Sequence, residues 1–220
     1  KIRESLRLIM KVIDQEHIDC DAQLQDTLIC GFKGKNWNNV YEEYEAEKKM
    51  DGTAKLFEGE DLKKEINTNL FTHGLLSRGH ALGLNPLKFI QGLSQVIERH
   101  GVTIYENTAV LGTAHHIAKT HLGDIKYKKI IWAIDVDYPS KNIKNLKTTV
   151  IVTRPLTHDE LGKIGFGERK KVVWDSHKNE NYFKVTIDGR IVAGFGGIIV
   201  GKNHKKTDPH LPHLKILQHF

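Results

Sequence analysis

The most regular hydrophobic pattern in the chain lies in the stretch GLNPLKFIQGLSQVIERHGVTIYENTAV, residues 83–110. Three apolar residues in its first half recur with the spacing of one face of an α-helix: Ile90, Leu93 and Ile97. The polar residues between them fall on the other faces. This pattern predicts an amphipathic helix.

Residues at both ends of this helix support the prediction. Asn85 can cap the first turn, and Pro86 suits the first helical position, where its missing N–H is not needed. Gly101 provides a left-handed stop after the last turn. The next residues, Val102–Tyr105, are predicted to form a strand.

The N-terminal third shows weaker patterns. Residues 1–17 predict an amphipathic helix with four apolar residues on one face: Ile2, Leu6, Ile9 and Ile13. Residues 18–32 alternate loosely and are interrupted by Gln25-Asp26, which favours a pair of short strands. A polar helix is expected to end at Asp51-Gly52.

Two further features precede the first stretch. Asp61 can cap a short helix that runs through Leu62 and Ile66. Residues 67–84 contain Gly74, Gly79 and Gly83, and these glycines predict a loop.

The segment after Val110 predicts two or three strands, with a turn at residues 122–124. It ends in the apolar run Ile130–Ile134. A strand that is apolar on both faces is typical of the centre of a parallel sheet covered by helices, so this run is expected to be buried.

From residue 148 the pattern changes to alternating strands separated by turns, which indicates an antiparallel sheet in a second structural unit. Thr157 and Glu160 form a capping-box pair that opens a short helix. In NYFKVTIDGRIVAGFGG, Asp188-Gly189 predicts a hairpin turn. The expected fold class is α/β (α+β).

Composition restricts the class of protein. The chain has 220 residues, 39% of them hydrophobic, which suits a globular protein with a substantial core. It contains no apolar run long enough to span a membrane and no signal-peptide core, so we expect a cytoplasmic protein. Cys20 and Cys30 suggest neither a disulfide framework nor a CxxC pair and are interpreted as small buried residues.

The formal charge of +6 raises the question of nucleic-acid binding. The lysines are scattered in small groups beside acidic residues, and no recognition helix or aromatic basic strand accompanies them. A solvated surface explains them better, so no nucleic-acid partner is expected.

Two other motifs are weak. GFGG at 194–197 follows a predicted strand but does not open a helix, so we interpret it as a strand end, bulge or turn and not as a dinucleotide fingerprint. The histidines at 115–116 and 204–219 lack the spacing of a metal-binding motif, and no metal site is predicted.

Three stretches resemble, in order and spacing, the FAD-dependent oxidoreductases related to D-amino-acid oxidase, glycine oxidase and sarcosine oxidase. They are GLNPLKFIQGLSQVIERHGVTIYENTAV, IKYKKIIWAIDVD and NYFKVTIDGRIVAGFGG. In that family, a helix begun by proline leads into a strand, and a following valine contacts the flavin nucleotide through its backbone. The second stretch is similar to a strand that usually ends in Ala-Thr-Gly or Ala-Thr-Asp, and the third to the substrate-sheet hairpin.

The resemblance implies particular residue roles. Val110, Ala133 and Ile134 correspond to flavin contacts, and Tyr182 and Lys184 to substrate-facing positions. Two positions depart from the family pattern: Ile134 stands where threonine is usual, and Lys184 where arginine is common. Catalytic residues are not assigned.

The resemblance also implies a domain organisation and an activity. Residues 1–19 and 80–137 would belong to a Rossmann-like FAD domain, 20–79 and 138–202 to a substrate domain, and 203–220 to the start of a helix. The GxGxxG loop would lie upstream of Lys1 and another flavin-binding segment downstream of Phe220, so the chain resembles a central fragment. The implied reaction is hydride transfer from a small amine or amino acid to FAD.

Two alternatives have other functions. A flavin-free interaction module could keep this architecture without the glycine loop, and a basic nucleic-acid-binding domain would be supported by charge alone. A strand followed by GxGxxG in the coding sequence upstream would favour the flavoprotein.

Overall fold

The computed structural model of the chain describes residues 2–32, 37–50, 52–134, 146–167, 170–176 and 181–199. The described helices are α1 (Ile2–Glu16), α2 (Trp37–Met50), α3 (Gly59–Glu65), α4 (Pro86–Arg99) and α5 (His158–Lys163). The described strands are β1 (Gln23–Gly31), β2 (Lys55–Glu58), β3 (His73–Gly83), β4 (Val110–Ala114), β5 (Ile117–Thr120), β6 (Gly123–Lys126), β7 (Leu146–Val152), β8 (Lys171–Asp175), β9 (Tyr182–Val185) and β10 (Ile191–Ile199). This is a mixed α/β fold.

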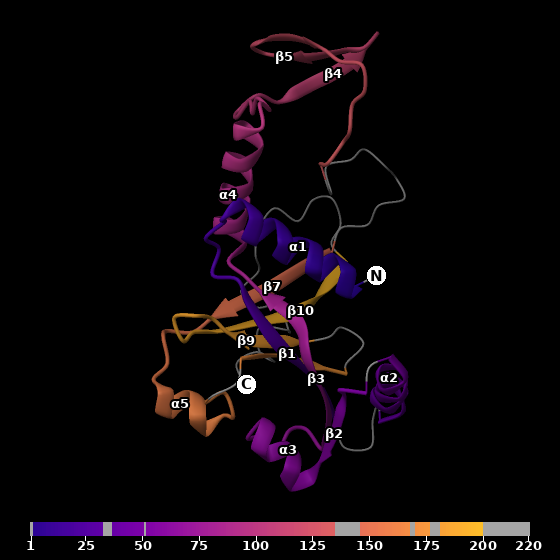
Figure 1. Cartoon of the computed structure of the whole chain (residues 1–220), viewed down its shortest axis with the longest axis vertical. Helices are drawn as coiled ribbons and strands as arrows, with labels where there is room; N and C mark the ends of the chain where they lie inside the picture. Colours follow the sequence, from indigo (N-terminus) through magenta and orange to yellow (C-terminus); the bar gives the residue numbers. More distant parts are fainter. Residues whose placement is uncertain are drawn as a thin grey trace.

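A seven-stranded sheet with the order β2-β3-β1-β8-β9-β10-β7 lies across the middle of the molecule (Figure 1). Its neighbouring strands are antiparallel except β1 and β8, which are parallel. Helices α3 and α5 lie on one side of this sheet and α1 and α4 on the other (Figure 1). A separate sheet, β4-β5-β6, occupies the far end of the long axis on the α4 side.

Strand β1 is continuous, so the predicted pair of short strands is wrong. Its pairing with β3 shifts register between Gln25 and Thr27, which marks a bulge. Asp26 at the bulge accepts a hydrogen bond on Oδ1 from the Gly79 N–H at 3.0 Å, and its own N–H donates to the Lys170 carbonyl at 3.1 Å. The polar pair that suggested a break therefore lies within a strand, where Asp26 forms hydrogen bonds with Gly79 of β3 through its side chain and with Lys170, just before β8, through its backbone.

Strand β3 occupies most of the segment that its glycines predicted to be a loop. A Cβ built on Gly74 would lie 2.8 Å from the Leu62 side chain, and one on Gly83 would lie 2.5 Å from the Gln25 side chain. These glycines allow neighbouring side chains to cross the strand closely, which is a known use of glycine within a sheet. Gly79 has φ +64° beside the β1 bulge.

The main hydrophobic core lies between the seven-stranded sheet and α3. Its buried residues come from both sheet and helix: Leu28, Cys30, Leu62, Ile66, Phe71, Leu76, Phe166 and Val173. Both Cys20 and Cys30 are buried and free, as predicted, and burial raises the pKa of each thiol.

Helices α1 and α4 pack together in a second cluster that contains Ile13, Ile18 and Val96. The predicted ends of α4 are confirmed. The Asn85 side chain accepts a hydrogen bond from the Lys88 N–H at 3.2 Å, and Gly101 has φ +83°.

Two predicted strands are wrong. Residues 102–105 and 130–134 are irregular, and their apolar side chains are exposed, including Ile131 at 90%. A strand is stabilised by pairing with a neighbour, and the described residues place no neighbour beside either segment. By contrast, the strands predicted after Val110 are confirmed as the β4-β5-β6 meander.

Helix α3 begins three residues earlier than predicted. Its N-cap is Glu58, whose side chain makes no capping hydrogen bond, and Asp61 lies within the first turn. Asp61 instead pairs with Lys64 one turn later, at 2.7 Å.

The capping box at the start of α5 is confirmed. The Glu160 N–H donates to Thr157 Oγ1 at 3.2 Å, and the Thr157 N–H donates to Glu160 Oε2 at 2.9 Å. Arg154 donates to both carboxylate oxygens of Glu160, at 3.0 and 2.6 Å. Hydrogen bonds from Arg154 and then from Thr157 hold the pKa of Glu160 at about 2.

This arrangement predicts a pH dependence of α5. Because the folded-state pKa of Glu160 is below the usual value of about 4.3, its stabilising effect is complete above that value and disappears as the pH falls toward 2. We expect an NMR titration of the Glu160 carboxyl to give a midpoint near 2. Arg154→Met should raise that midpoint; an unchanged midpoint would contradict the role of Arg154.

Candidate functional site

The β9–β10 hairpin positions the residues predicted to face a substrate. Its turn is at Asp188-Gly189, as predicted, and the Thr186 N–H donates to the Arg190 carbonyl at 2.8 Å. Hydrogen bonds to the Asp188 carboxylate from Thr186 and then from Arg190 lower its pKa. The turn fixes the hairpin register, in which Tyr182 lies opposite Gly194 and Lys184 opposite Val192.

Alternation along β9 places neighbouring side chains on opposite faces of the sheet. Phe183 and Val185 pack against the main core, and we call their side the Phe183 face. Tyr182 and Lys184 are half-buried on the other side, the Tyr182 face. Alternation along the hairpin predicts that Phe183, Val185 and Ile187 face the core; this is confirmed for Phe183 and Val185 but is wrong for Ile187, which lies in the turn and is 60% exposed.

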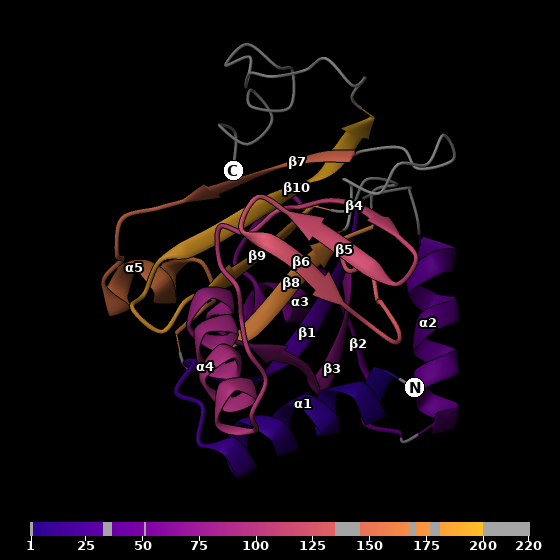
Figure 2. The ribbon, with the colours of Figure 1, turned by 90° about the horizontal axis from the view of Figure 1, so that it is seen from above.

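The Tyr182 face is turned away from α3, which contributes to the core on the Phe183 face. It therefore faces the side of the molecule on which α1, α4 and the three-stranded sheet lie (Figure 1). Seen along the long axis, that small sheet overlies β8 and β9 (Figure 2).

Tyr182 lies against two residues of neighbouring strands. Its ring centroid is 5.6 Å from that of Trp174, its direct partner on β8, with an interplanar angle of 44°. On the other side, a Cβ added to Gly194 would be 2.1 Å from the Tyr182 Cζ atom. The phenol ring therefore lies over Gly194, in contact with an indole.

A buried polar pair lies directly behind these rings. Asp175 follows Trp174, Asn181 precedes Tyr182, and the two are 3% and 8% exposed. Asp175 accepts hydrogen bonds on Oδ1 from the Asn181 N–H at 2.9 Å and on Oδ2 from the Asn181 side-chain amide. The Asp175 N–H donates to the Asn181 carbonyl at 2.9 Å. These bonds hold the ends of β8 and β9 together.

Sequence reasoning missed Trp174, Gly194 and the Asp175–Asn181 pair. Alternating strands were predicted from residue 148 onward, but the register of Trp174 against β9 depends on long-range pairing. Gly194 was noticed only within GFGG, where the prediction of a strand or bulge is confirmed by its position in β10 and by the register shift between Phe195 and Ile198.

The residues predicted to contact a flavin lie elsewhere. Val110 begins β4 and is 40% exposed, and Ala133 and Ile134 are exposed at the end of the irregular segment. That segment leads from the three-stranded sheet back toward the seven-stranded sheet (Figure 1). The structure places Val110 on the same side of the main sheet as Tyr182 but does not bring the two into contact.

Val110, Ala133 and Ile134 expose apolar side chains, whose chemistry is compatible with the ring systems of FAD. Their exposed apolar side chains could pack on a flavin ring system or on its adenine. The pyrophosphate would need a glycine-rich loop at a helix N-terminus. Within the described ranges, α4 begins with Asn85-Pro86, and the first turns of α3 and α5 are acidic, so none of these helices offers that site.

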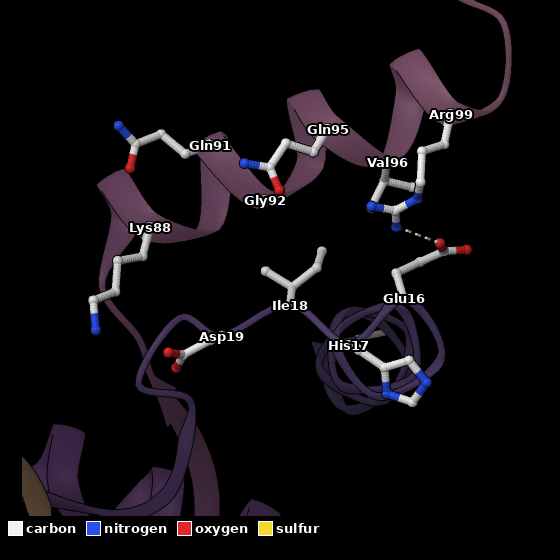
Figure 3. Close-up of a pocket in the computed structure, with 10 residues that line it drawn as sticks. All are labelled: Glu16, His17, Ile18, Asp19, Lys88, Gln91, Gly92, Gln95, Val96 and Arg99. Atoms are coloured by element: carbon white, nitrogen blue, oxygen red, sulfur yellow. Dashed lines mark hydrogen bonds and ion pairs between the residues drawn. The ribbon is translucent and has the colours of Figure 1, made fainter.

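Two cavities lie among the described residues, and one of them reaches Tyr182 and Gly194. One, of about 330 Å³, lies between the end of α1 and α4 (Figure 3). Its two cationic side chains are paired, Arg99 with Glu16 at 3.4 Å and Lys88 with Asp21 at 2.8 Å. The other, of about 380 Å³, is mostly apolar and lies between Phe71 and the β9–β10 hairpin, where Tyr182, Phe183 and Gly194 are among the residues that line it.

Other kinds of site have no support among the described residues. Within the described ranges, no group of three or more histidine, cysteine, aspartate or glutamate side chains is arranged to hold a metal ion. The histidines at 204–219 lie outside those ranges. Of the described helices, none is long and apolar enough to cross a membrane.

Comparison with known proteins identifies the architecture. The family model described as "FAD dependent oxidoreductase" matches residues 2–219. A search of curated proteins finds no match.

Several solved structures share the fold. L-proline dehydrogenase from P. horikoshii has 16% sequence identity and a TM-score of 0.77, with 99% of this chain and 60% of that chain covered. Glycine oxidase from Bacillus cereus has 12% identity and a TM-score of 0.72, with 99% and 61% covered. Iminodiacetate oxidase from Chelativorans sp. has 14% identity and a TM-score of 0.68, with 99% and 60% covered. The chain spans about 60% of the length of these similar structures.

Proposed function

Because this chain belongs to the family of FAD-dependent oxidoreductases, we propose that it is the central part of a flavoenzyme that oxidises a small amine or amino acid. The observation that carries this proposal is the position of Tyr182 and Lys184 on the sheet face opposite the core, turned to the side of Val110. The names of the similar structures, which include a proline dehydrogenase and a glycine oxidase, support a small amino acid as substrate.

Exposed apolar side chains support the proposal that the chain is part of a longer polypeptide. On α4 and just after it, six large apolar residues are 37–66% exposed: Leu87, Ile90, Ile97, Val102, Ile104 and Tyr105. Several large apolar side chains exposed along one helix and the residues after it are typical of a surface that contacts another part of the protein. We propose that the rest of a Rossmann-like domain, including the glycine-rich loop, covers it.

We propose two interleaved domains with the boundaries expected from the sequence, residues 1–19 and 80–137 on the flavin side and 20–79 and 138–202 on the substrate side. The boundary between residues 79 and 80 falls within β3, so this long strand would belong to both domains. Residues 203–220 lie outside the described ranges.

In this proposal each residue has a defined task. The Tyr182 O–H donates a hydrogen bond to the substrate carboxylate or amine nitrogen, and the Lys184 ammonium attracts the carboxylate. Trp174 and Val172 exclude water beside them, which strengthens both interactions. Val110, Ala133 and Ile134 contact the flavin. FAD, when bound beside these residues, would supply the hydride acceptor for oxidation at the carbon next to the substrate nitrogen, and water would hydrolyse the imine product.

The test uses the longer polypeptide that contains this chain. We expect it to show flavin absorbance that bleaches anaerobically on addition of its amino acid or amine substrate. Tyr182→Phe should lower kcat/KM about 2- to 10-fold, the effect of losing one hydrogen bond worth roughly 0.5–1.5 kcal/mol. Flavin content should not change, since Tyr182 is not proposed to hold the cofactor.

Tyr41→Phe is a matched control, because Tyr41 lies on α2, is 45% exposed and has no proposed role. It should keep the kinetics of the unmodified enzyme. A longer polypeptide that binds no flavin would overturn the proposal and favour an interaction module of the same architecture. Unchanged kinetics for Tyr182→Phe would overturn only the role of Tyr182.

A further inference from the structure

We infer that Gly194 is a positioning residue that sets the orientation of the Tyr182 ring. The inference rests on the proposed function only for its effect on the reaction. The structural part of the inference concerns only the packing of this chain. It says that the Tyr182 ring can lie across β10 because Gly194 has no side chain.

The space around Gly194 supports this inference. A Cβ built on Gly194 would be 2.1 Å from Cζ of Tyr182, 2.3 Å from its Oη and 2.5 Å from its Cε1. Carbon atoms in contact are normally about 3.5–4.0 Å apart, so the ring could not keep this position above any other residue. The φ angle of Gly194 is outside the left-handed region, so backbone conformation does not explain the glycine.

The ring is also held on its other side. Trp174, the Tyr182 partner on β8, has its ring centroid 5.6 Å away. The hydrogen bonds between Asp175 and Asn181 fix the ends of β8 and β9, and therefore the register of the two aromatic residues. Tyr182 is thus confined between an indole and a strand that lacks a side chain beneath it.

This arrangement determines where the phenolic O–H lies. The Cζ and Oη atoms are the ones nearest to the missing Cβ, so the hydroxyl end of the ring extends over β10. A side chain at position 194 would lift that end off the strand and move the donor. A donor held in place before the ligand arrives loses less conformational entropy on binding, so the glycine preorganises the proposed site.

The structural arm of the test uses this chain with Trp37→Phe and Trp132→Phe, which leaves Trp174 as its one tryptophan out of three. We expect Gly194→Ala to change the near-UV circular dichroism of Trp174. The double variant Gly194→Ala/Tyr182→Ala should give the same near-UV spectrum as Tyr182→Ala alone, because no phenol ring is left for the added Cβ to collide with. Gly162→Ala on α5, where an added Cβ meets nothing within 4 Å, should leave the signal unchanged.

The kinetic arm uses the longer flavin-containing polypeptide. Gly194→Ala should lower kcat/KM several-fold with flavin content retained, and should cause no further loss in the Tyr182→Ala background. If Gly194→Ala alone fails to fold, recovery of folding by Tyr182→Ala supports the inference. An unchanged Trp174 signal, a failure of that rescue, or an equal kinetic loss in both backgrounds would overturn it.

The two proposals fail in distinguishable ways. If Gly194→Ala changes the Trp174 signal but Tyr182→Ala keeps full kcat/KM, the substrate role of Tyr182 is wrong and the packing role of Gly194 stands. If Tyr182→Ala lowers kcat/KM but Gly194→Ala changes neither the signal nor the kinetics, the role of Gly194 is wrong and the proposed function stands.

Discussion

Replacement of Gly165 by alanine is expected to lower the free energy of unfolding by about 2–5 kcal/mol, the sum of roughly 1–2 for a left-handed alanine and roughly 1–3 for overpacking. Gly165 has φ +87°, and an added Cβ would be 2.8 Å from both the Glu65 carbonyl oxygen and the Ile66 Cα. These are backbone atoms at the end of α3, so they cannot move aside as a flexible side chain could. Urea denaturation followed by circular dichroism would measure the loss.

Gly101 provides a matched control for this prediction. It occupies the same position after α4 as Gly165 does after α5, with φ +83°, but an added Cβ there meets nothing within 4 Å. Gly101→Ala should therefore cost only the conformational part, about 1–2 kcal/mol. Equal losses of unfolding free energy in the two variants would show that the close contact of the added Cβ with the end of α3 has no energetic cost, which would contradict this prediction.

Features that depend on a few neighbouring residues were predicted correctly from the sequence. The Asn85 cap of α4, the Thr157–Glu160 capping box and the Asp188-Gly189 turn each involve groups within three or four positions along the chain. Their hydrogen bonds join groups that are close in sequence, so they do not depend on long-range packing. Local chemistry was sufficient for these elements.

The prediction of a loop at 67–84 was wrong because the reason for its glycines is not local. Gly74 lies on β3 beneath Leu62 of α3, and Gly83 lies beneath Gln25 of β1. Both glycines leave room for a side chain that is distant in sequence. A glycine in a turn and a glycine in a crowded strand look the same in a single sequence. Only the packing of distant side chains shows which of the two a given glycine is.

The predicted strands at 102–105 and 130–134 were wrong for a different reason. Their apolar composition is suitable for buried strands, but within the described structure they have no strand beside them and their side chains are exposed. Apolar and β-branched residues favour a paired and buried strand, but the neighbouring strand must come from another part of the protein. This agrees with our proposal that the chain is part of a longer polypeptide.

The candidate site depends partly on local sequence and partly on long-range pairing. Alternation along β9 was sufficient to place Tyr182 and Lys184 opposite Phe183 and Val185. The contact with Trp174 could not be predicted, because it depends on the register between β8 and β9. That register is set by the buried Asp175–Asn181 hydrogen bonds and by packing against β1, not by the residues of the hairpin itself.

Lys171→Met is expected to lower the free energy of unfolding by about 3–5 kcal/mol, the usual cost of removing one member of a buried ion pair. Lys171 begins β8, and its side chain is 3% exposed. Its ammonium lies 3.3 Å from the Glu65 carboxylate, donates a hydrogen bond to the Glu65 carbonyl, and sits 5.7 Å from the centroid of the Phe166 ring. Methionine fills similar space but leaves the Glu65 carboxylate, 15% exposed, without this cation. Thermal or urea denaturation would measure the effect.

Lys170→Met is the control, because the neighbouring lysine side chain is exposed and the change should stay within about 0.5 kcal/mol. A second variant tests the interaction itself. Replacing both charged partners by apolar residues removes the uncompensated carboxylate, so Lys171→Met/Glu65→Leu should be more stable than Lys171→Met alone. If the double variant instead loses the sum of the two single effects, Lys171 and Glu65 do not stabilise each other. The contact between β8 and the end of α3 would then depend on Gly165 and the apolar residues around Phe166.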